Sequence, residues 1–193
     1  MQRFVSLGFA ATTILAAPLF ADVARADASA SSSTGAAGVA PSERHPFAGT
    51  FTYAGGDKQR AGIDAAIETA ITGMFFVAKP IARSKLHEKT AVKNSVGFSF
   101  AKGKITSTAS GAAPATSKDD GTGAPYKVDG ETIRVLQNVT PNAHLLQTFA
   151  ATDGTRSNDY TLSADGKTLT MTVTLSSGKL PRAVHYALTY QRD

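Results

Sequence analysis

The sequence predicts a mainly β fold: an antiparallel, up-and-down β-barrel of about eight to ten strands, with a helix pair inserted after the first strand. The clearest observation is the stretch from Thr168 to Leu175, where threonine and apolar residues alternate without a break. A period of two places the apolar residues on one face of a strand. Similar stretches precede and follow it, separated by turn signals such as Asp129-Gly130. Many one-faced strands without a long crossover favour a barrel over a sandwich.

The N-terminus has the pattern of a secretory signal peptide, which we predict to span residues 1–26. A positively charged start and an apolar run lead to the small residues of a cleavage site at Ala24-Arg25-Ala26. Residues 27–44, rich in Ala, Ser and Gly, are predicted to be a flexible tether, and residues 45–193 a single lipocalin-like barrel domain. Cleavage after about Ala26 predicts a secreted or periplasmic protein.

Composition limits the classes of function. The 193-residue chain has a formal charge of +5 and no cysteine, so an exported form folds without disulfides on its core alone, which its length permits. The positive excess is small and does not by itself indicate nucleic acid. The predicted strands carry threonine rather than the interleaved aromatic residues that stack on single-stranded nucleic acid. We therefore expect no nucleic-acid partner.

The predicted first strand, Thr50 to Tyr53, is followed by a helical segment. Apolar residues recur at helical spacing between residues 63 and 77, behind Asp57, which is a good N-cap residue. Pro80 is expected to end or kink this helix at about residue 78 and to start a second, shorter one that runs to about Thr90.

From Ser95 onward the apolar period changes to two. Residues 111–123, rich in Gly, Ala, Ser and Asp, are predicted to be a long loop. The remaining strands are expected around residues 96–100, 105, 125–128, 133–135, 145–149, 160–162, 168–175 and 184–190.

This order of elements, from Phe47 to Arg192, resembles the fatty-acid-binding branch of the lipocalin-like (calycin) superfamily. The resemblance implies that the helix pair, Ile63 to Leu86, lies over the barrel mouth as a lid. It is one of architecture, because Gly49-Thr50-Phe51 stands where lipocalins carry Gly-x-Trp. The final strand, Val184 to Arg192, lacks the Arg-x-Tyr arrangement with which family members bind a fatty-acid carboxylate. A carboxylate-clamping mechanism is therefore not carried over.

The candidate ligand-binding residues are the inward-facing apolar and aromatic side chains, together with one aromatic residue of the lid. The same side chains serve equally well as a packed core, because ligand cavities in barrels are also mostly apolar. Tyrosines are the best polar candidates, since a buried hydroxyl needs a partner. The candidates are Tyr53, Phe75, Phe98, Phe100, Tyr160, Met171 and Tyr186.

The sequence contains no legible catalytic constellation, and we expect no enzyme activity, no cofactor and no metal. The four histidines fall in different predicted elements, and no cysteine supports them. His185, between two inward residues, is expected to face outward. Ser176-Ser177-Gly178-Lys179 matches Ser-x-x-Lys but lies in a predicted connection and not at the start of a helix.

The densest basic stretch contains Lys79, Arg83, Lys85 and Lys89, opposed only by Glu88. A solvated helix face is the simple interpretation, and docking onto an anionic membrane surface is the sharper one.

Our leading hypothesis is an exported soluble barrel that binds a small hydrophobic ligand or lipid. The alternative is a protein-interaction or inhibitor module with a solid core and no small-molecule ligand. An enzyme ranks last.

Overall fold

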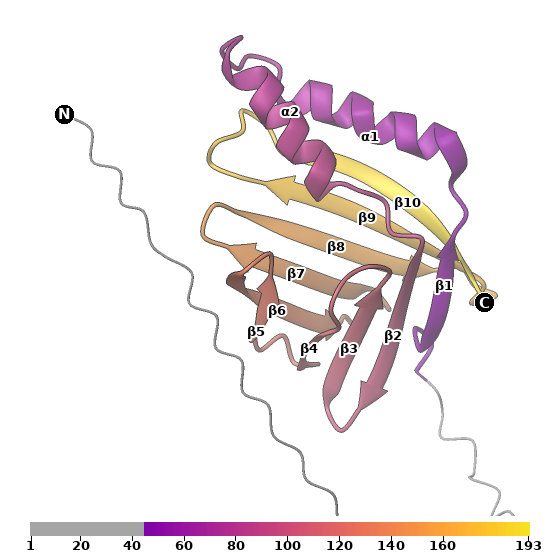
Figure 1. Cartoon of the computed structure of the whole chain (residues 1–193). Coiled ribbons are helices and arrows are strands. Elements are labelled where there is room, and N and C mark those ends of the chain that lie inside the picture. The colour runs from indigo at the N-terminus through magenta and orange to yellow at the C-terminus, as the bar shows by residue number, and fades with distance from the viewer. Residues whose placement is uncertain (1–44) are drawn as a thin grey trace, which may run out of the picture. The chain divides into compact units, whose positions relative to one another are not determined.

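The computed structural model describes residues 45–193, which form a nearly closed antiparallel barrel with two helices at one end (Figure 1). The predicted mainly β fold, its strand number and the position of its helix pair are confirmed. The predicted signal peptide and tether lie outside the described residues. The elements are β1 (Gly49–Tyr53), α1 (Gly56–Ala70), α2 (Ala78–Lys89), β2 (Ser95–Ala101), β3 (Lys104–Ala109), β4 (Ala115–Lys118), β5 (Ala124–Val128), β6 (Glu131–Val139), β7 (Leu145–Ala151), β8 (Gly154–Leu162), β9 (Thr168–Ser176) and β10 (Val184–Arg192).

The strands lie in the order β4-β3-β2-β1-β10-β9-β8-β7-β6-β5, and every pairing is antiparallel. The two edge strands, β4 and β5, do not pair with each other. The gap is crossed by an isolated bridge between Asp120 and Asn138 and by the side chain of Gln137. The Gln137 amide donates to the carbonyl oxygens of Ile105 (2.9 Å) and Ala115 (3.3 Å). A buried side chain therefore helps to close the barrel where backbone pairing stops.

The alternation in β9 sets the interior as the sequence predicts. Leu169, Met171 and Val173 are buried, and the threonines between them lie on the outer face. Outward placement of His185 is also confirmed, because its neighbours on β10 are the buried ones. Period two thus sorts the side chains of the long strands between core and solvent.

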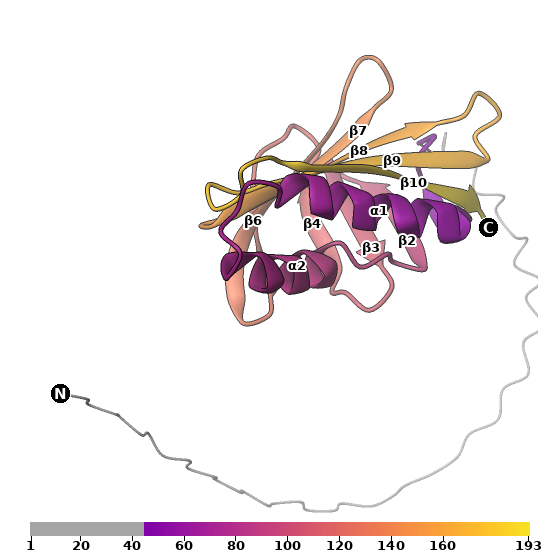
Figure 2. The same cartoon turned by 90° about the horizontal axis from the view of Figure 1, so that it is seen from above.

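Helix α1 is part of the core. Ile63 and Ile67 form an apolar stripe at i+4 spacing and are buried, and Ile71, just after the helix, is buried as well. The Gln59 amide donates to the hydroxyl of Thr189 on β10 (2.9 Å), and the Thr189 backbone N–H donates to Gln59 Oε1 (2.9 Å). Seen from above, α1 and α2 lie side by side, and α1 runs along β10 (Figure 2).

The first helix is shorter than predicted. It ends at Ala70, and Gly73 has a φ of 90°, which is incompatible with a continuing right-handed helix. The N-cap position belongs to Gly55, so Asp57 lies in the first turn instead. Residues 71–77 form the connection, and the expected continuation of the buried stripe to residue 77 is wrong. Pro80 lies in the first turn of α2, as predicted.

The predicted long loop at 111–123 contains strand β4. Its inward residues, Ala115 and Ser117, are buried but small, so they gave no apolar alternation to recognise. Within the described residues, no helix is both long enough and apolar enough to cross a membrane.

Candidate functional site

Three of the predicted ligand-binding residues meet on the inner wall of the barrel. The Phe98 ring stands edge-on to the Tyr160 ring, with centroids 4.9 Å apart, and Tyr160 is paired across the sheet with Met171. All three are at least nine-tenths buried. Tyr186 lies on the same wall, because Asn158, Val173 and Tyr186 form one row across β8, β9 and β10.

The other three predicted residues lie elsewhere. Tyr53 is at the end of β1 next to α1, where its hydroxyl donates to the Gly56 carbonyl oxygen (2.9 Å). Phe100 is at the far end of β2 and stacks on His45, with ring centroids 3.8 Å apart. Phe75 is outside the barrel in the α1–α2 connection and is 86% exposed. Ligand contact by all seven candidates stays a prediction.

A buried polar network fills the β6–β8 side of the interior, and its central residue is Gln147. The Gln147 amide donates to the Ser107 hydroxyl (2.5 Å) and to Gln137 Oε1 (3.1 Å). Its own Oε1 accepts from Asn158 Nδ2 (2.9 Å) and from the Tyr160 hydroxyl (3.0 Å). Every one of these polar groups therefore has a partner, as buried polar groups require.

Arg156, Asn158 and Tyr160 share the inward face of β8, and the sequence prediction named only the last. The period of two that places Tyr160 inward also places Asn158 and Arg156 inward, so that signal was present. It was missed because polar residues were not expected at inward positions.

Two further hydroxyls on the inner wall have no such partner. Tyr186 and Tyr190 on β10 are 8% and 0% exposed, and neither hydroxyl has a hydrogen-bond partner among the described residues. Burial raises the pKa of both phenols, and it raises the pKa of Tyr160 to about 12. All three remain neutral hydrogen-bond donors near neutral pH.

Arg156 lies two residues before Asn158 on the inward face of β8. Its positive charge opposes the rise in the pKa of Tyr160, Tyr186 and Tyr190 alike. Arg156 Nε donates to Asn158 Oδ1 (3.0 Å), and Nη1 donates to the carbonyl oxygen of Lys89 at the end of α2 (2.8 Å). Arg156 therefore joins the interior polar groups to the second helix.

The polar groups of this wall that lack a full set of partners are hydrogen-bond donors. A guanidinium can only donate hydrogen bonds, and the unpartnered hydroxyls of Tyr186 and Tyr190 have free donors. Apolar residues such as Val173 and Leu188 surround these donors. The arrangement suits a molecule with an apolar body and a hydrogen-bond acceptor at one point.

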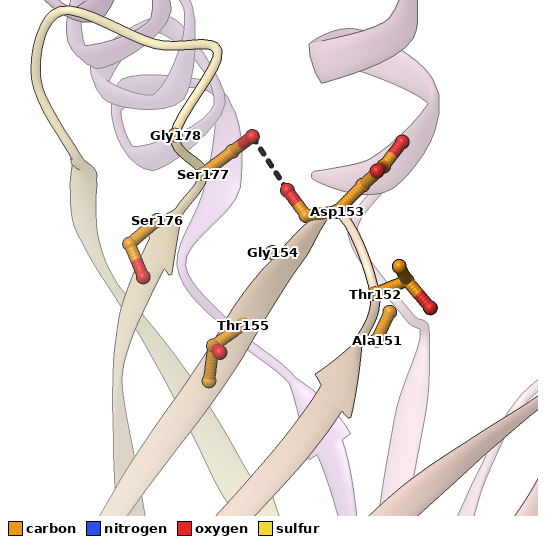
Figure 3. Close-up of a pocket in the computed structure, with 8 residues that line it drawn as sticks. All are labelled: Ala151, Thr152, Asp153, Gly154, Thr155, Ser176, Ser177 and Gly178. Carbon is orange, nitrogen blue, oxygen red and sulfur yellow. Dashed lines mark hydrogen bonds between the residues drawn. The ribbon is translucent and has the colours of Figure 1, made fainter.

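A separate hollow of about 350 Å³ lies on the surface, between the β7–β8 turn and the β9–β10 connection (Figure 3). The Ser177 hydroxyl, inside the Ser-x-x-Lys match that begins at Ser176, donates to the Asp153 carbonyl oxygen (2.6 Å) and supports a turn. The Lys179 ammonium donates to the Asp153 carboxylate and lowers its pKa. A Cβ on Gly154 would lie 2.5 Å from the Ser176 carbonyl oxygen, so this position requires glycine. We assign these contacts to turn structure.

Metal ligands do not gather in the described part of the chain, where no group of three or more His, Cys, Asp or Glu residues could hold an ion. The His144 ring lies 2.9 Å from the Asp159 carboxylate on the neighbouring strand, as an isolated pair.

No protein-family model matches the sequence, and no curated protein matches it. Among solved structures, a secretory abundant heat-soluble protein from Ramazzottius varieornatus is similar to 77% of this chain over 96% of its own, with a TM-score of 0.51 and 10% identity. A Schistosoma mansoni fatty-acid-binding protein in complex with arachidonic acid matches 78% of this chain and 98% of its own, with a TM-score of 0.45 and 16% identity. A zebrafish ileal bile-acid-binding protein complexed with cholic acid matches 77% of this chain and 100% of its own, with a TM-score of 0.48 and 11% identity. The predicted lipocalin-like layout is confirmed as an architecture.

Proposed function

We propose that the barrel binds a small hydrophobic ligand non-covalently and is not an enzyme. The observation that carries this proposal is the pair of unpartnered, buried hydroxyls of Tyr186 and Tyr190 on the inner wall of the barrel. An unsatisfied buried hydroxyl costs about 1 to 3 kcal/mol, which a bound acceptor offsets.

The ligand that fits these donors is an amphiphile. Its apolar body contacts the wall that includes Phe98 and Met171, and its polar end is a carboxylate, carbonyl or ether oxygen near Arg156. Hydrophobic burial supplies most of the affinity in such a site, and the polar contact fixes the orientation.

Native mass spectrometry tests this proposal with dodecanoate and with dodecane, which lacks the acceptor. We expect dodecanoate to bind with 1:1 stoichiometry and more tightly than dodecane. Arg156→Gln is expected to weaken dodecanoate binding about tenfold, since a charged hydrogen bond contributes about 1.5 kcal/mol or more. The matched control is Arg134→Gln, because Arg134 is exposed on the outer face of β6 and its loss leaves the wall unchanged.

Native mass spectrometry also distinguishes ligand binding from the alternative, a protein-interaction or inhibitor module. Protein purified from its own host and extracted with organic solvent should release a small amphiphile. A clean apo mass, with no uptake of either probe, contradicts ligand binding and favours a solid core whose partner is a protein.

Contact with an anionic membrane is a second candidate function. Four basic residues of α2 predict it, but Arg83 pairs with Glu68 of α1 and Lys89 pairs with Asp129. Lys79 and Lys85 make no ion pair with another described residue. The observation that favours a membrane is the exposure of Phe75 and Phe76, just before Lys79 in the chain. Sedimentation with phosphatidylglycerol vesicles at rising salt tests the contribution of the charges.

Export is the third element of the proposal. It rests on the predicted signal peptide at residues 1–26. An intact mass of protein recovered from the medium or the periplasm should match a chain that begins near Asp27, and retention of full-length protein in the cytoplasm contradicts it.

A further inference from the structure

The connection between α1 and α2, together with the start of α2, carries an exposed apolar surface, which we call the apolar tip: Phe75, Phe76, Val77 and Ile81. Their exposed fractions are 86%, 85%, 64% and 61%, and they are the large hydrophobic side chains that the described chain leaves exposed. The connection lies at the upper end of the molecule in Figure 1, above the strands. In the view from above, it is where the two helices meet (Figure 2).

The local geometry keeps the apolar tip outside the core. The left-handed φ of 90° at Gly73 turns the chain away before Phe75, so the two aromatic residues cannot continue the buried stripe of α1. In α2, Leu86 is buried and faces the barrel, while Ile81 lies on the exposed face four residues after Val77. A contiguous exposed apolar surface of this kind marks an interaction site more often than a scattered one does.

The charges beside the apolar tip select the partner. Between Ile71 and Lys89 the only acidic residue is Glu88, and Lys79 and Lys85 make no ion pair with a described residue. Lys85 follows Ile81 by four residues and continues the exposed face of α2. Two copies of a basic surface repel each other, whereas an anionic bilayer offers negative head groups above an apolar layer.

We propose that the apolar tip inserts into the interface of a bilayer that contains anionic lipids. Phe75, Phe76 and Val77 enter the boundary between head groups and acyl chains, and Lys79 and Lys85 contact the phosphates. This inference rests on the proposed membrane contact and adds that apolar insertion, more than charge, holds the protein there. It is independent of ligand binding in the barrel.

Vesicle flotation of the full chain measures the binding, with phosphatidylcholine vesicles that contain or lack phosphatidylglycerol. We expect binding to the anionic vesicles, and a loss of affinity of about tenfold or more in Phe75→Ser/Phe76→Ser, since two aromatic side chains leave the bilayer. Lys79→Gln/Lys85→Gln should lose affinity only severalfold. Lys102→Gln/Lys104→Gln is the charge-matched control, at the β2–β3 turn, and should bind as the wild type does.

The chain contains no Trp, so Phe76→Trp gives a single reporter of insertion. Its emission should shift to the blue with anionic vesicles and be quenched by brominated lipid, and Lys102→Trp should show neither effect.

Three outcomes overturn the inference. Wild-type affinity in the phenylalanine variant, with loss in the lysine variant, leaves a charge contact without insertion. No flotation of any form contradicts membrane contact altogether and leaves the ligand proposal untouched. Dimerisation that Phe75→Ser/Phe76→Ser abolishes, with no flotation, makes the apolar tip an interface between two copies.

Discussion

Two sets of buried polar side chains lie inside one barrel and differ in whether their hydrogen bonds are complete. On the β6–β8 side, Gln147 links Ser107, Asn158 and Tyr160, and each group has a partner. On β10, the hydroxyls of Tyr186 and Tyr190 are equally buried and have none among the described residues.

The difference separates structure from function. A complete network stabilises one packing of the core, and removing a member leaves its partners unsatisfied. A buried hydroxyl without a partner adds no hydrogen bond to the folded state, so its removal should not lower the free energy of unfolding. We infer that the Gln147 network is structural and that the β10 hydroxyls are retained for a ligand.

The largest expected effect is that of Gln147→Leu. It removes the acceptor of the buried Tyr160 hydroxyl, one of the two acceptors of Asn158 Nδ2, and the donor to Ser107 and Gln137. We therefore expect a loss of about 3 kcal/mol in the free energy of unfolding. Urea denaturation measures it. Gln191→Leu, at an exposed position on β10, should change stability by less than about 0.5 kcal/mol. Equal effects of the two substitutions contradict a structural role for the network.

Tyr160→Phe is expected to have the next largest effect. The phenyl ring keeps its edge-on contact with Phe98, but Gln147 Oε1 loses one of its two donors. We expect a loss of about 1 to 2 kcal/mol in the free energy of unfolding. A neutral result in urea denaturation shows that the network repacks without this hydroxyl.

The outline of this barrel could be predicted from sequence because most of its strands alternate strongly. Thr168 to Leu175 and Val184 to Tyr190 each place their large apolar residues on the buried face. Strand β4 could not be predicted, because Ala115 and Ser117 are too small to give a hydrophobic signal.

Part of the polar interior could be predicted from the sequence. Tyr160 and Tyr186 were predicted because a buried hydroxyl needs a partner. The period of two that places Tyr160 on the inward face of β8 also places Arg156 there. What no local pattern reveals is pairing across distant strands, such as the contact of Gln147 with Ser107, forty residues apart. Exposure of Phe75 depends on the backbone at Gly73, which helical periodicity does not report.

Alkaline pH is expected to lower stability through both sets. The folded-state pKa of Tyr160, Tyr186 and Tyr190 is raised above the unfolded value of 10, so the stabilisation is complete below pH 10 and is lost as pH rises. Each tyrosine removes up to about 1.4 kcal/mol per pH unit while it is ionised only in the unfolded chain. Thermal unfolding between pH 9 and 12 measures this. Tyr190→Phe should reduce the slope, and an unchanged slope contradicts burial of that phenol.

The smallest expected change in stability is also the sharpest test of the comparison. Tyr186→Phe and Tyr190→Phe each remove a buried hydroxyl that has no protein partner, so stability should stay the same or rise by up to about 1 kcal/mol. Dodecanoate binding should nevertheless weaken severalfold in each variant, because the acceptor loses a donor. The opposite signs of the two measurements are decisive. A loss of stability without a loss of binding assigns these hydroxyls to the same structural role as Tyr160, because hydroxyls that are kept for a ligand should not be needed for folding.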